Sequence, residues 1–235
     1  MPYYERDGIS IYHGDMRDVL PCIQAADLVV TDPPYVIGLA SSVQETSEVG
    51  GWADLMNAAT WYGTWLAECG RLTALSGAAW VFNSWRSFPA LARGAREARW
   101  PIQSLLVWDK QSIGTGLRGL RPRYELVALF AHRRFSIPDR TITDIYTCRW
   151  PAGCKPTGHP AEKPVPLLRY LIEISGGHLV LDPFVGSGST LVAAKQLGRS
   201  AVGIELEERW CELAANRLEA TAPASDGTDG GQVPR

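Results

Sequence analysis

Four short apolar segments of this chain each end at an acidic residue, and this pattern limits the fold more than any other feature. The segments cover residues 9–12, 28–31, 178–181 and 201–205, and the acids at or just past their ends are Asp15, Asp32, Asp182 and Glu205. Apolar, β-branched runs of this length are typical of strands buried in a parallel sheet. Because ligands of such sheets bind beyond the carboxyl ends of the strands, we expect the four acids to share one rim and one site.

Helical patterns alternate with the strands, which predicts an α/β fold: a mostly parallel sheet covered by helices. The expected helices are 16–24, 54–71, 88–100, 164–175, 189–197 and 207–220, and the further strands are 78–83, 104–108 and 124–131. Residues 36–52 are predicted to form a loop, 133–161 an irregular insert and 221–235 a disordered tail. The organisation expected is one domain over residues 1–220 followed by that tail.

The composition fits one globular domain. The chain has 235 residues, of which 46% are hydrophobic and 20% charged, enough for a sizeable core. It has no run of about 18 apolar residues and no apolar signal core near Met1, so we expect no membrane association and a cytoplasmic location. The five cysteines form no Cys-x-x-Cys, and the spacing of Cys148, Cys154 and His159 does not match common zinc modules. No metal is therefore expected.

The formal net charge of −2 conceals a basic middle. Residues 86–155 hold 13 Lys or Arg against 5 Asp or Glu, and the rest of the chain holds 10 against 20. A basic segment on an acidic body suits a polyanion such as nucleic acid. A chance cluster of solvated arginines would give the same count.

A glycine-rich loop follows the strand at 178–181, where residues 182–190 read Asp-Pro-Phe-Val-Gly-Ser-Gly-Ser-Thr. Gly186 and Gly188 permit a positive φ and let the backbone approach a ligand, and the Ser-Thr pair can cap the next helix. The N-terminus of that helix favours an anionic group, and the Glu205 carboxylate can accept hydrogen bonds from the hydroxyls of a ribose. A Gly-x-Gly alone would fit many turns, but this succession predicts a nucleotide-type cofactor.

The second block is Asp32-Pro33-Pro34-Tyr35, directly after a buried strand. Two prolines fix the backbone and remove two donors, which leaves the Pro33 carbonyl as an acceptor beside the Asp32 carboxylate. Two acceptors can accept hydrogen bonds from both N–H groups of an exocyclic amine and direct the nitrogen lone pair at a methyl group on a sulfonium. Tyr35 can stack on the target base, worth about 1–3 kcal/mol. The alternative interpretation is a rigid turn after a strand.

Together and in this order, the two blocks resemble those of the amino-group DNA methyltransferases that use S-adenosylmethionine. The catalytic block precedes the cofactor block, as in the circularly permuted class called beta. The resemblance covers nearly all of residues 9–219. It implies a Rossmann-like methyltransferase fold, S-adenosylmethionine as cofactor with S-adenosylhomocysteine as product, and double-stranded DNA as substrate. Members are often dimers, so a homodimer and a monomer are both kept as alternatives.

The resemblance also implies residue roles. Asp32, Pro33, Pro34 and Tyr35 would be catalytic, and the residues that would bind the cofactor are Asp15, Lys163, Asp182, Phe184, Gly186, Ser187, Gly188, Ser189, Thr190 and Glu205. Asp15 is similar to the acid that receives the adenine amino group of the cofactor. Glu162-Lys163-Pro164 resembles the block that precedes the cofactor loop, and Ser189 stands where many members carry Thr.

A base inside a duplex must be flipped out to reach such a site. The resemblance gives the insert at 133–161 a role in target recognition, and residues 36–52 would cover the flipped base. The basic residues expected to contact DNA are Arg118, Arg121, Arg123, Arg133, Arg134, Arg140, Arg149 and Lys155. Most of the nine tryptophans are expected to pack in the core, and they are not expected to be platforms on which bases stack.

An Asp at the first position of the catalytic block resembles adenine-N6 enzymes, whereas cytosine-N4 enzymes more often carry Ser there. The leading expectation is a site-specific, adenine-specific DNA methyltransferase, either part of a restriction-modification pair or an orphan. The alternatives are a cytosine-N4 enzyme and a DNA-binding regulator that has lost catalysis, against which both intact blocks argue. Cys22, in a Pro-Cys pair that could suggest cytosine-C5 chemistry, is expected to be a small buried hydrophobe.

Overall fold

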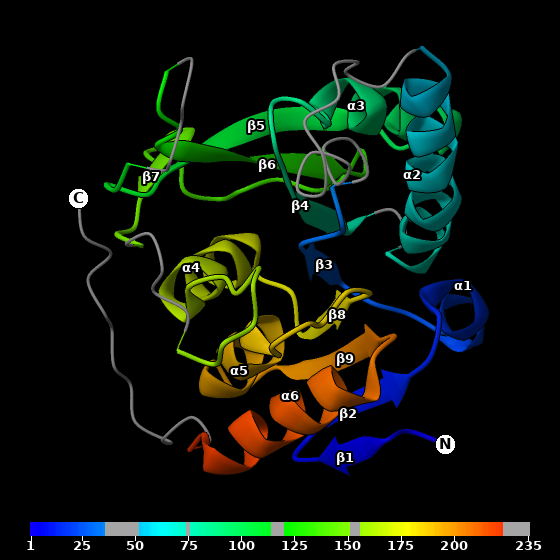
Figure 1. Cartoon of the computed structure of the whole chain (residues 1–235), viewed down its shortest axis with the longest axis vertical. Helices are drawn as coiled ribbons and strands as arrows, with labels where there is room; N and C mark the ends of the chain where they lie inside the picture. The colour runs from blue at the N-terminus through cyan, green and yellow to red at the C-terminus, as the bar shows by residue number, and fades with distance from the viewer. Residues whose placement is uncertain (36–51, 74–75, 114–119, 151–155, 223–235) are drawn as a thin grey trace, which may run out of the picture.

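The computed structural model describes residues 1–35, 52–73, 76–113, 120–150 and 156–222, which form one α/β body around a single sheet (Figure 1). The strand order is β1-β2-β9-β8-β3-β4-β6-β5-β7. The strands are β1 Tyr4–Arg6, β2 Ile9–His13, β3 Leu28–Thr31, β4 Ala78–Asn83, β5 Ile102–Asp109, β6 Tyr124–Ala131, β7 Ile145–Thr147, β8 Leu179–Asp182 and β9 Ser200–Glu205. The five central strands from β2 to β4 are parallel, and β6 runs antiparallel to both of its neighbours.

Helices cover both faces of the sheet, as expected (Figure 1). They are α1 Met16–Val19, α2 Trp52–Leu72, α3 Phe88–Glu97, α4 Val165–Ser175, α5 Ser189–Gln196 and α6 Glu208–Ala220. Because successive strand side chains point to opposite faces, Leu28 and Val30 join the core under α4–α6, whereas Val29 joins the core under α2 and α3. No helix within the described ranges combines the length and the apolar character needed to cross a membrane.

The helix expected at 16–24 is wrong in its length. The α-helix ends at Val19, and Leu20–Cys22 form a 3₁₀ turn that has Pro21 near its start. Proline removes a backbone donor and suits the first turn of a helix but not its interior. Cys22 follows this turn on the surface and is exposed, so the expectation that it is buried is also wrong.

Two strands have no counterpart in the sequence prediction. They are the edge strands β1 and β7, each three residues long, and most of their side chains are exposed or half-buried. Strands with so few buried positions carry no clear alternation of apolar and polar residues. The insert predicted at 133–161 therefore contains one strand that pairs with β5. The loop expected at 36–52, except for Trp52, lies outside the described residues, as does the tail from 223 onward.

The carboxyl ends of the parallel strands lie at one edge of the sheet, which we call the rim. Register pairs near these ends join Val29 with Leu181, Asp182 with Gly203, and His13 with Glu205. Asp15 and Asp32 follow β2 and β3 within two residues. The four acids predicted from the sequence therefore do meet at the rim.

Candidate functional site

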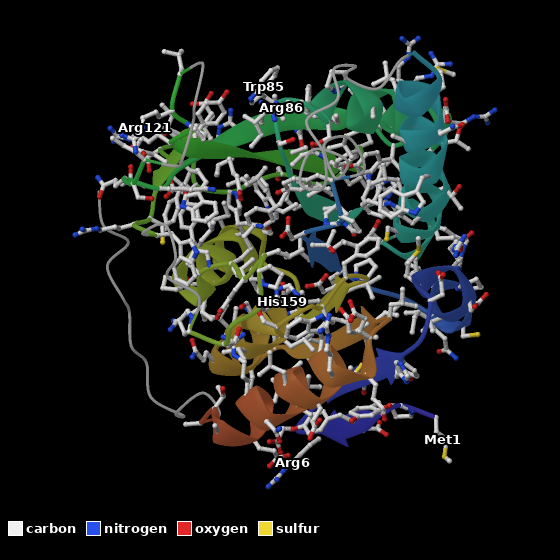
Figure 2. The ribbon with its side chains drawn as sticks, in the orientation of Figure 1. Met1, Arg6, Trp85, Arg86, Arg121 and His159 are labelled. Atoms are coloured by element: carbon white, nitrogen blue, oxygen red, sulfur yellow. The ribbon has the colours of Figure 1, made fainter. Side chains whose placement is uncertain are left out.

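A cavity of about 1710 Å³ opens at the rim. Its lining includes both sequence blocks, because Asp32 and Tyr35 border it together with Gly186 and Glu205. Figure 2 shows His159 near the half of the molecule that holds β8, β9 and α6, and Trp85 near the half that holds β4–β6. The catalytic and cofactor blocks, about 150 residues apart in the sequence, thus share one space.

The glycine loop after β8 adopts the positive φ angles that its glycines permit. Gly186 and Gly188 have φ values of 51° and 80°, in the left-handed region that side chains disfavour. A Cβ on Gly186 would lie 3.0 Å from Cε1 of His159, and one on Gly188 would lie 2.7 Å from Cβ of Ala214 in α6. Gly186 faces the cavity, whereas Gly188 lets the loop pack on α6.

Glu205 fastens this loop to the end of β9. Its Oε2 accepts a hydrogen bond from the Gly186 N–H at 2.8 Å, and its Oε1 accepts one from the Glu207 N–H at 2.9 Å. Each carboxylate oxygen keeps a second lone pair, and the side chain borders the cavity beside Phe184. An acceptor for hydroxyl groups is therefore present where the sequence predicts one.

Other residues predicted for the cofactor block are buried and take part in hydrogen bonds that hold the loop in place. Asp182 is 2% exposed and accepts hydrogen bonds from Thr31 Oγ1 at 2.6 Å and from the Phe184 N–H at 3.0 Å. Burial raises its pKa to about 6, although bonds from Thr31 and Thr190 oppose this shift. Ser187, Ser189 and Thr190 are also buried. Arg217 donates to the Ser187 carbonyl at 2.6 Å and to Ser189 Oγ at 3.0 Å.

Asp15 borders the cavity as the N-cap of α1. Its carboxylate accepts hydrogen bonds from the backbone N–H of Arg17 at 2.8 Å and from Nε of the same arginine at 2.9 Å. These bonds lower the pKa of Asp15 below its ordinary value. The acid is therefore ionised at the cavity edge with an exposed cation beside it.

One carboxylate oxygen of Asp32, a residue that borders the cavity, makes no hydrogen bond in good geometry within the described residues. Asp32 Oδ2 accepts a hydrogen bond from Lys163 Nζ. The other oxygen, Oδ1, is buried and meets no donor in good geometry within the described residues, although the Tyr35 hydroxyl lies nearby. Burial raises the pKa of Asp32, and the Lys163 ammonium opposes that shift. Burial likewise raises the pKa of Tyr35.

The sequence predicts Lys163 as a cofactor ligand, but the structure places its ammonium on the catalytic carboxylate. Lys163 Nζ also lies 3.6 Å from Glu125 Oε2, and Glu125 Oε1 accepts a hydrogen bond from Lys110 Nζ at 2.8 Å. Sequence reasoning missed Glu125 and Lys110. Their only signal was position: Glu125 is the second residue of β6, and Lys110 directly follows β5.

The predicted DNA contacts divide between two edges of the sheet. Arg121 and Arg123 border the cavity, and Arg123 forms two 2.7 Å hydrogen bonds to Asp109. Arg133 and Arg134 follow β6, whose last residue pairs with the first residue of β4, so they lie at the edge opposite the rim. These two arginines are therefore separated from Arg121 and Arg123 by the length of the sheet, which the sequence analysis did not foresee because it left the direction of β6 open.

Two further predicted DNA contacts, Arg140 and Arg149, do not border the cavity. Arg140 precedes β7, and Arg149 follows β7 on the rim side. Arg118 and Lys155 lie outside the described residues.

Two residues at the mouth were not predicted. Trp85 and Arg86 follow β4 at the rim, border the cavity, and appear beside each other in Figure 2. Trp85 is 63% exposed, and the Arg86 guanidinium carbon lies 5.4 Å from the centre of its ring. Trp85 is therefore an exception to the expectation that most of the tryptophans pack in the core. Its place directly after a predicted strand was the available signal.

His159 lies at the cavity, although its sequence position suggested a role only in a zinc site. Its ring lies 4.5 Å, centre to centre, from the edge-on ring of Trp210, and its Nδ1 accepts a 3.2 Å hydrogen bond from the Ala161 N–H. Both rings border the cavity near Gly186. They form an aromatic wall on the cofactor side.

Known proteins match this chain in both sequence and fold. Type II methyltransferase M.ScaI of Streptomyces caespitosus is 28% identical over 94% of this chain and 84% of its own length. Putative methylase YubD of Escherichia coli (strain K12) is 32% identical over 85% of each chain. Among solved structures, the complex of M1.HpyAVI with S-adenosylmethionine has a TM-score of 0.68 at 23% identity, covering 89% of this chain and 100% of the other.

A second solved structure, the cytosine-N4-specific PvuII DNA methyltransferase, has a TM-score of 0.74 at 18% identity over 92% of this chain and 88% of its own. At these identities the two structures show a shared fold. Residues 26–216 match the sequence model of the DNA methylase family, which groups N6 and N4 methyltransferases. The chain therefore belongs to the DNA methylases, the amino-group methyltransferases that take their methyl group from S-adenosylmethionine.

Proposed function

We propose that this DNA methyltransferase is site-specific and methylates the N6 amino group of adenine. The observation that carries the proposal is the Asp32 Oδ1 atom, a buried acceptor that makes no hydrogen bond in good geometry among the described residues, although the Tyr35 hydroxyl lies nearby. Asp32 itself borders the cavity that it shares with the glycine loop. A buried acceptor costs free energy when it makes no hydrogen bond. An exocyclic amine supplies the missing donor, and the Pro33 carbonyl is a second acceptor in the same block.

The cofactor side of the cavity fits S-adenosylmethionine. Gly186 leaves room that a side chain would fill, Glu205 offers a carboxylate to hydroxyl groups, and Asp15 offers one to an amino group. When bound, S-adenosylmethionine supplies a methyl on sulfonium: the amine lone pair forms the new N–C bond, sulfur keeps the electron pair of the broken C–S bond, and nitrogen sheds one proton.

Asp32 acts on the amine side. Its carboxylate accepts a hydrogen bond from an N–H group of the amine and stabilises the positive charge that develops on nitrogen. Such an interaction is stronger in the transition state than in the ground state, which is the condition for catalysis. Tyr35, half-buried beside Asp32, would hold the plane of the flipped base by stacking.

The DNA would approach the cavity mouth. Arg86, Arg121 and Arg123 gather there from the segments after β4 and before β6, and Trp85 presents an exposed ring beside them. Arginines position phosphates and pair with guanine edges. We do not include Arg133 and Arg134 in this face, because they lie across the sheet from it. A cytoplasmic location fits the free thiols of Cys22, Cys69, Cys148 and Cys211.

Nucleoside analysis after labelled methyl transfer tests the proposal. The purified chain is incubated with duplex DNA and methyl-labelled S-adenosylmethionine, and the digested nucleosides are separated. We expect the label on N6-methyl-2′-deoxyadenosine, and only with duplexes that contain one fixed sequence. Label on N4-methylcytosine would favour the cytosine alternative, a specificity found on the same fold in the PvuII enzyme. DNA binding without any transfer would favour the regulator that has lost catalysis.

A further inference from the structure

Four charged side chains of alternating sign form a chain that leads away from the catalytic block. The order is Asp32, Lys163, Glu125, Lys110, and the links are the Asp32–Lys163 ion pair, 3.6 Å from Lys163 to Glu125, and 2.8 Å from Glu125 to Lys110. The Lys163 side chain is 9% exposed, the least of the four. We call this set the buried charge chain.

Lys163 is enclosed by groups that favour a cation. Its Nζ lies 5.2 Å from the ring centre of Phe82 and 5.9 Å from that of Tyr35, in addition to its two carboxylate partners. Removing a lysine from water is costly unless it is paired, and aromatic faces compensate only part of that cost. Two carboxylates around one ammonium keep Lys163 charged despite its burial.

We propose that Lys163, itself held by Glu125, is a positioning residue that keeps Asp32 ionised and leaves its Oδ1 atom available to the target amine. The inference rests on the proposed function, since it assigns the support of the same catalytic carboxylate. Lys163 makes and breaks no bond in the methyl transfer, and its protons stay on Nζ. It acts through Asp32 and does not touch the base.

The ionisation of Asp32 matters because a neutral carboxyl would lose the charge that stabilises a cationic nitrogen. Burial raises the pKa of Asp32, and nearby Glu125 raises it further. Asp182 is a third acid close enough to interact, and the Tyr35 hydroxyl lies beside the carboxylate. Against these groups, Lys163 is the cation that pairs with Asp32 within the described part of the chain.

The state of Lys163 supports the same assignment. Burial alone would lower its pKa, but the carboxylates of Asp32 and Glu125 outweigh burial and raise the pKa above its ordinary value. The ammonium is therefore protonated at neutral pH. Glu125 in turn is held ionised by Lys163 and Lys110, whose charges outweigh its own burial and lower its pKa.

The sharpest test compares Lys163→Met with Lys195→Met. Lys195 is also buried, with Nζ 3.0 Å from the Leu218 carbonyl and 3.1 Å from Asp7, and lies outside the proposed machinery. The turnover number is measured against pH with saturating cofactor and DNA, and cofactor affinity is measured by calorimetry. The pKa of the Asp32 carboxyl is followed in parallel by carbon NMR of the free protein, a readout that needs no activity.

We expect Lys163→Met to reduce turnover at neutral pH by about 10²-fold or more, to move the acidic limb of the pH profile upward, and to raise the Asp32 pKa. Cofactor affinity should stay within about threefold of the wild-type value, well short of a tenfold change. Lys195→Met should show neither the shifted limb nor the raised pKa. Lys163→Arg, which keeps the charge, should restore the acidic limb toward its wild-type position.

Glu125→Gln separates ionisation from packing. It removes an acid that repels the Asp32 carboxylate, so the Asp32 pKa should not rise. Turnover should still fall, because Lys163 loses one of the two carboxylates that hold it in place. Opposite pKa effects at Lys163 and Glu125 would not arise from a purely structural ion pair. If Lys163→Met does not fold, Lys163→Gln removes the same charge while keeping a donor, and the same pKa change is expected.

Two results would overturn the inference while wild-type methyl transfer remains intact. One is a Lys163→Met enzyme with an unchanged Asp32 pKa and acidic limb. The other is a loss of cofactor affinity of tenfold or more with normal turnover at saturation, which would return Lys163 to the cofactor site. Absence of methyl transfer by the wild-type chain would instead contradict the proposed function, and the NMR titration would still report on the Lys163–Asp32 pair.

Discussion

Thr31 Oγ1 donates a 2.6 Å hydrogen bond to the carboxylate of Asp182, a residue 151 positions later in the chain. The residue just before the catalytic block is thereby tied to the first residue of the cofactor loop. Both groups are buried, with exposed fractions of 1% and 2%. This bond fixes the relative placement of the two blocks at their closest point in the sheet.

The pKa of Asp182 predicts how stability depends on pH. Folding raises this pKa from its ordinary value of 3.8 to about 6, mainly through burial. The folded chain therefore binds the proton more tightly, so the stabilisation is present below about pH 4 and is lost as pH rises through about 6. Asp182→Asn should gain stability relative to wild type across that window, on the order of 3 kcal/mol.

Urea denaturation of both proteins at pH 4 and pH 7.5 measures this difference. Asp139→Asn is the control of opposite sign, because hydrogen bonds from Thr141 lower the pKa of that exposed carboxyl. A constant difference between Asp182→Asn and wild type at the two pH values would contradict the assignment.

Gly186→Val should abolish cofactor binding and leave the domain folded. A β-branched residue is disfavoured at a φ of 51°, and its Cβ would lie 3.0 Å from the His159 ring at the cavity. Calorimetry with S-adenosylmethionine or S-adenosylhomocysteine measures binding. Gly176→Val is the matched control, since Gly176 has a φ of 76° but a Cβ at that position would meet no atom within 4 Å. Equal affinity losses in both variants would point to general backbone strain.

Asp32→Ala should reduce turnover by about 10²–10³-fold or more, by analogy with the removal of one preorganised electrostatic interaction. Cofactor affinity should change little, because Asp15, Gly186 and Glu205 lie on the other side of the shared cavity. Single-turnover methyl transfer with saturating DNA and cofactor is the appropriate assay. Normal turnover in this variant would exclude Asp32 as the group that receives the amine.

The position of the DNA face predicts a contrast between two pairs of arginines. Arg86→Glu and Arg121→Glu should weaken DNA binding and reduce its salt dependence, by a slope of about 0.9 for each phosphate that is no longer bound. Arg133→Glu and Arg134→Glu carry the same charge change at the opposite edge of the sheet and should bind nearly as wild type. Fluorescence titrations at several salt concentrations compare them. Stronger effects at Arg133 and Arg134 would place the DNA on the other edge.

Local patterns were enough to predict most of the fold. Leu28–Thr31 and Ala78–Asn83 are completely buried strands, and continuous apolar runs of this length announce such strands. The acids at the strand ends were predictable for the same reason, since parallel strands carry their ends to one rim. The glycine loop could be predicted from its own local sequence alone.

What could not be predicted depends on contacts between distant segments. The Lys163–Asp32 pair joins residues 131 positions apart, and no periodicity reports such a pairing. The positions of Arg133 and Glu125 depend on the direction of β6, which antiparallel pairing with β4 reverses. A central strand looks the same from its sequence whichever way it runs.

That reversed strand has a consequence for how target specificity can evolve. Because β5 ends and β6 begins at the rim, Lys110 and residues 121–123, described residues on either side of the hairpin connection, border the cavity. Insertions or exchanges at a hairpin tip leave the register of its two strands intact. The chemistry resides on the neighbouring parallel strands, so the tip can be replaced as a cassette while Asp32 and the glycine loop keep their geometry. A family built on this plan can diversify the sequences it recognises without rebuilding its catalytic apparatus.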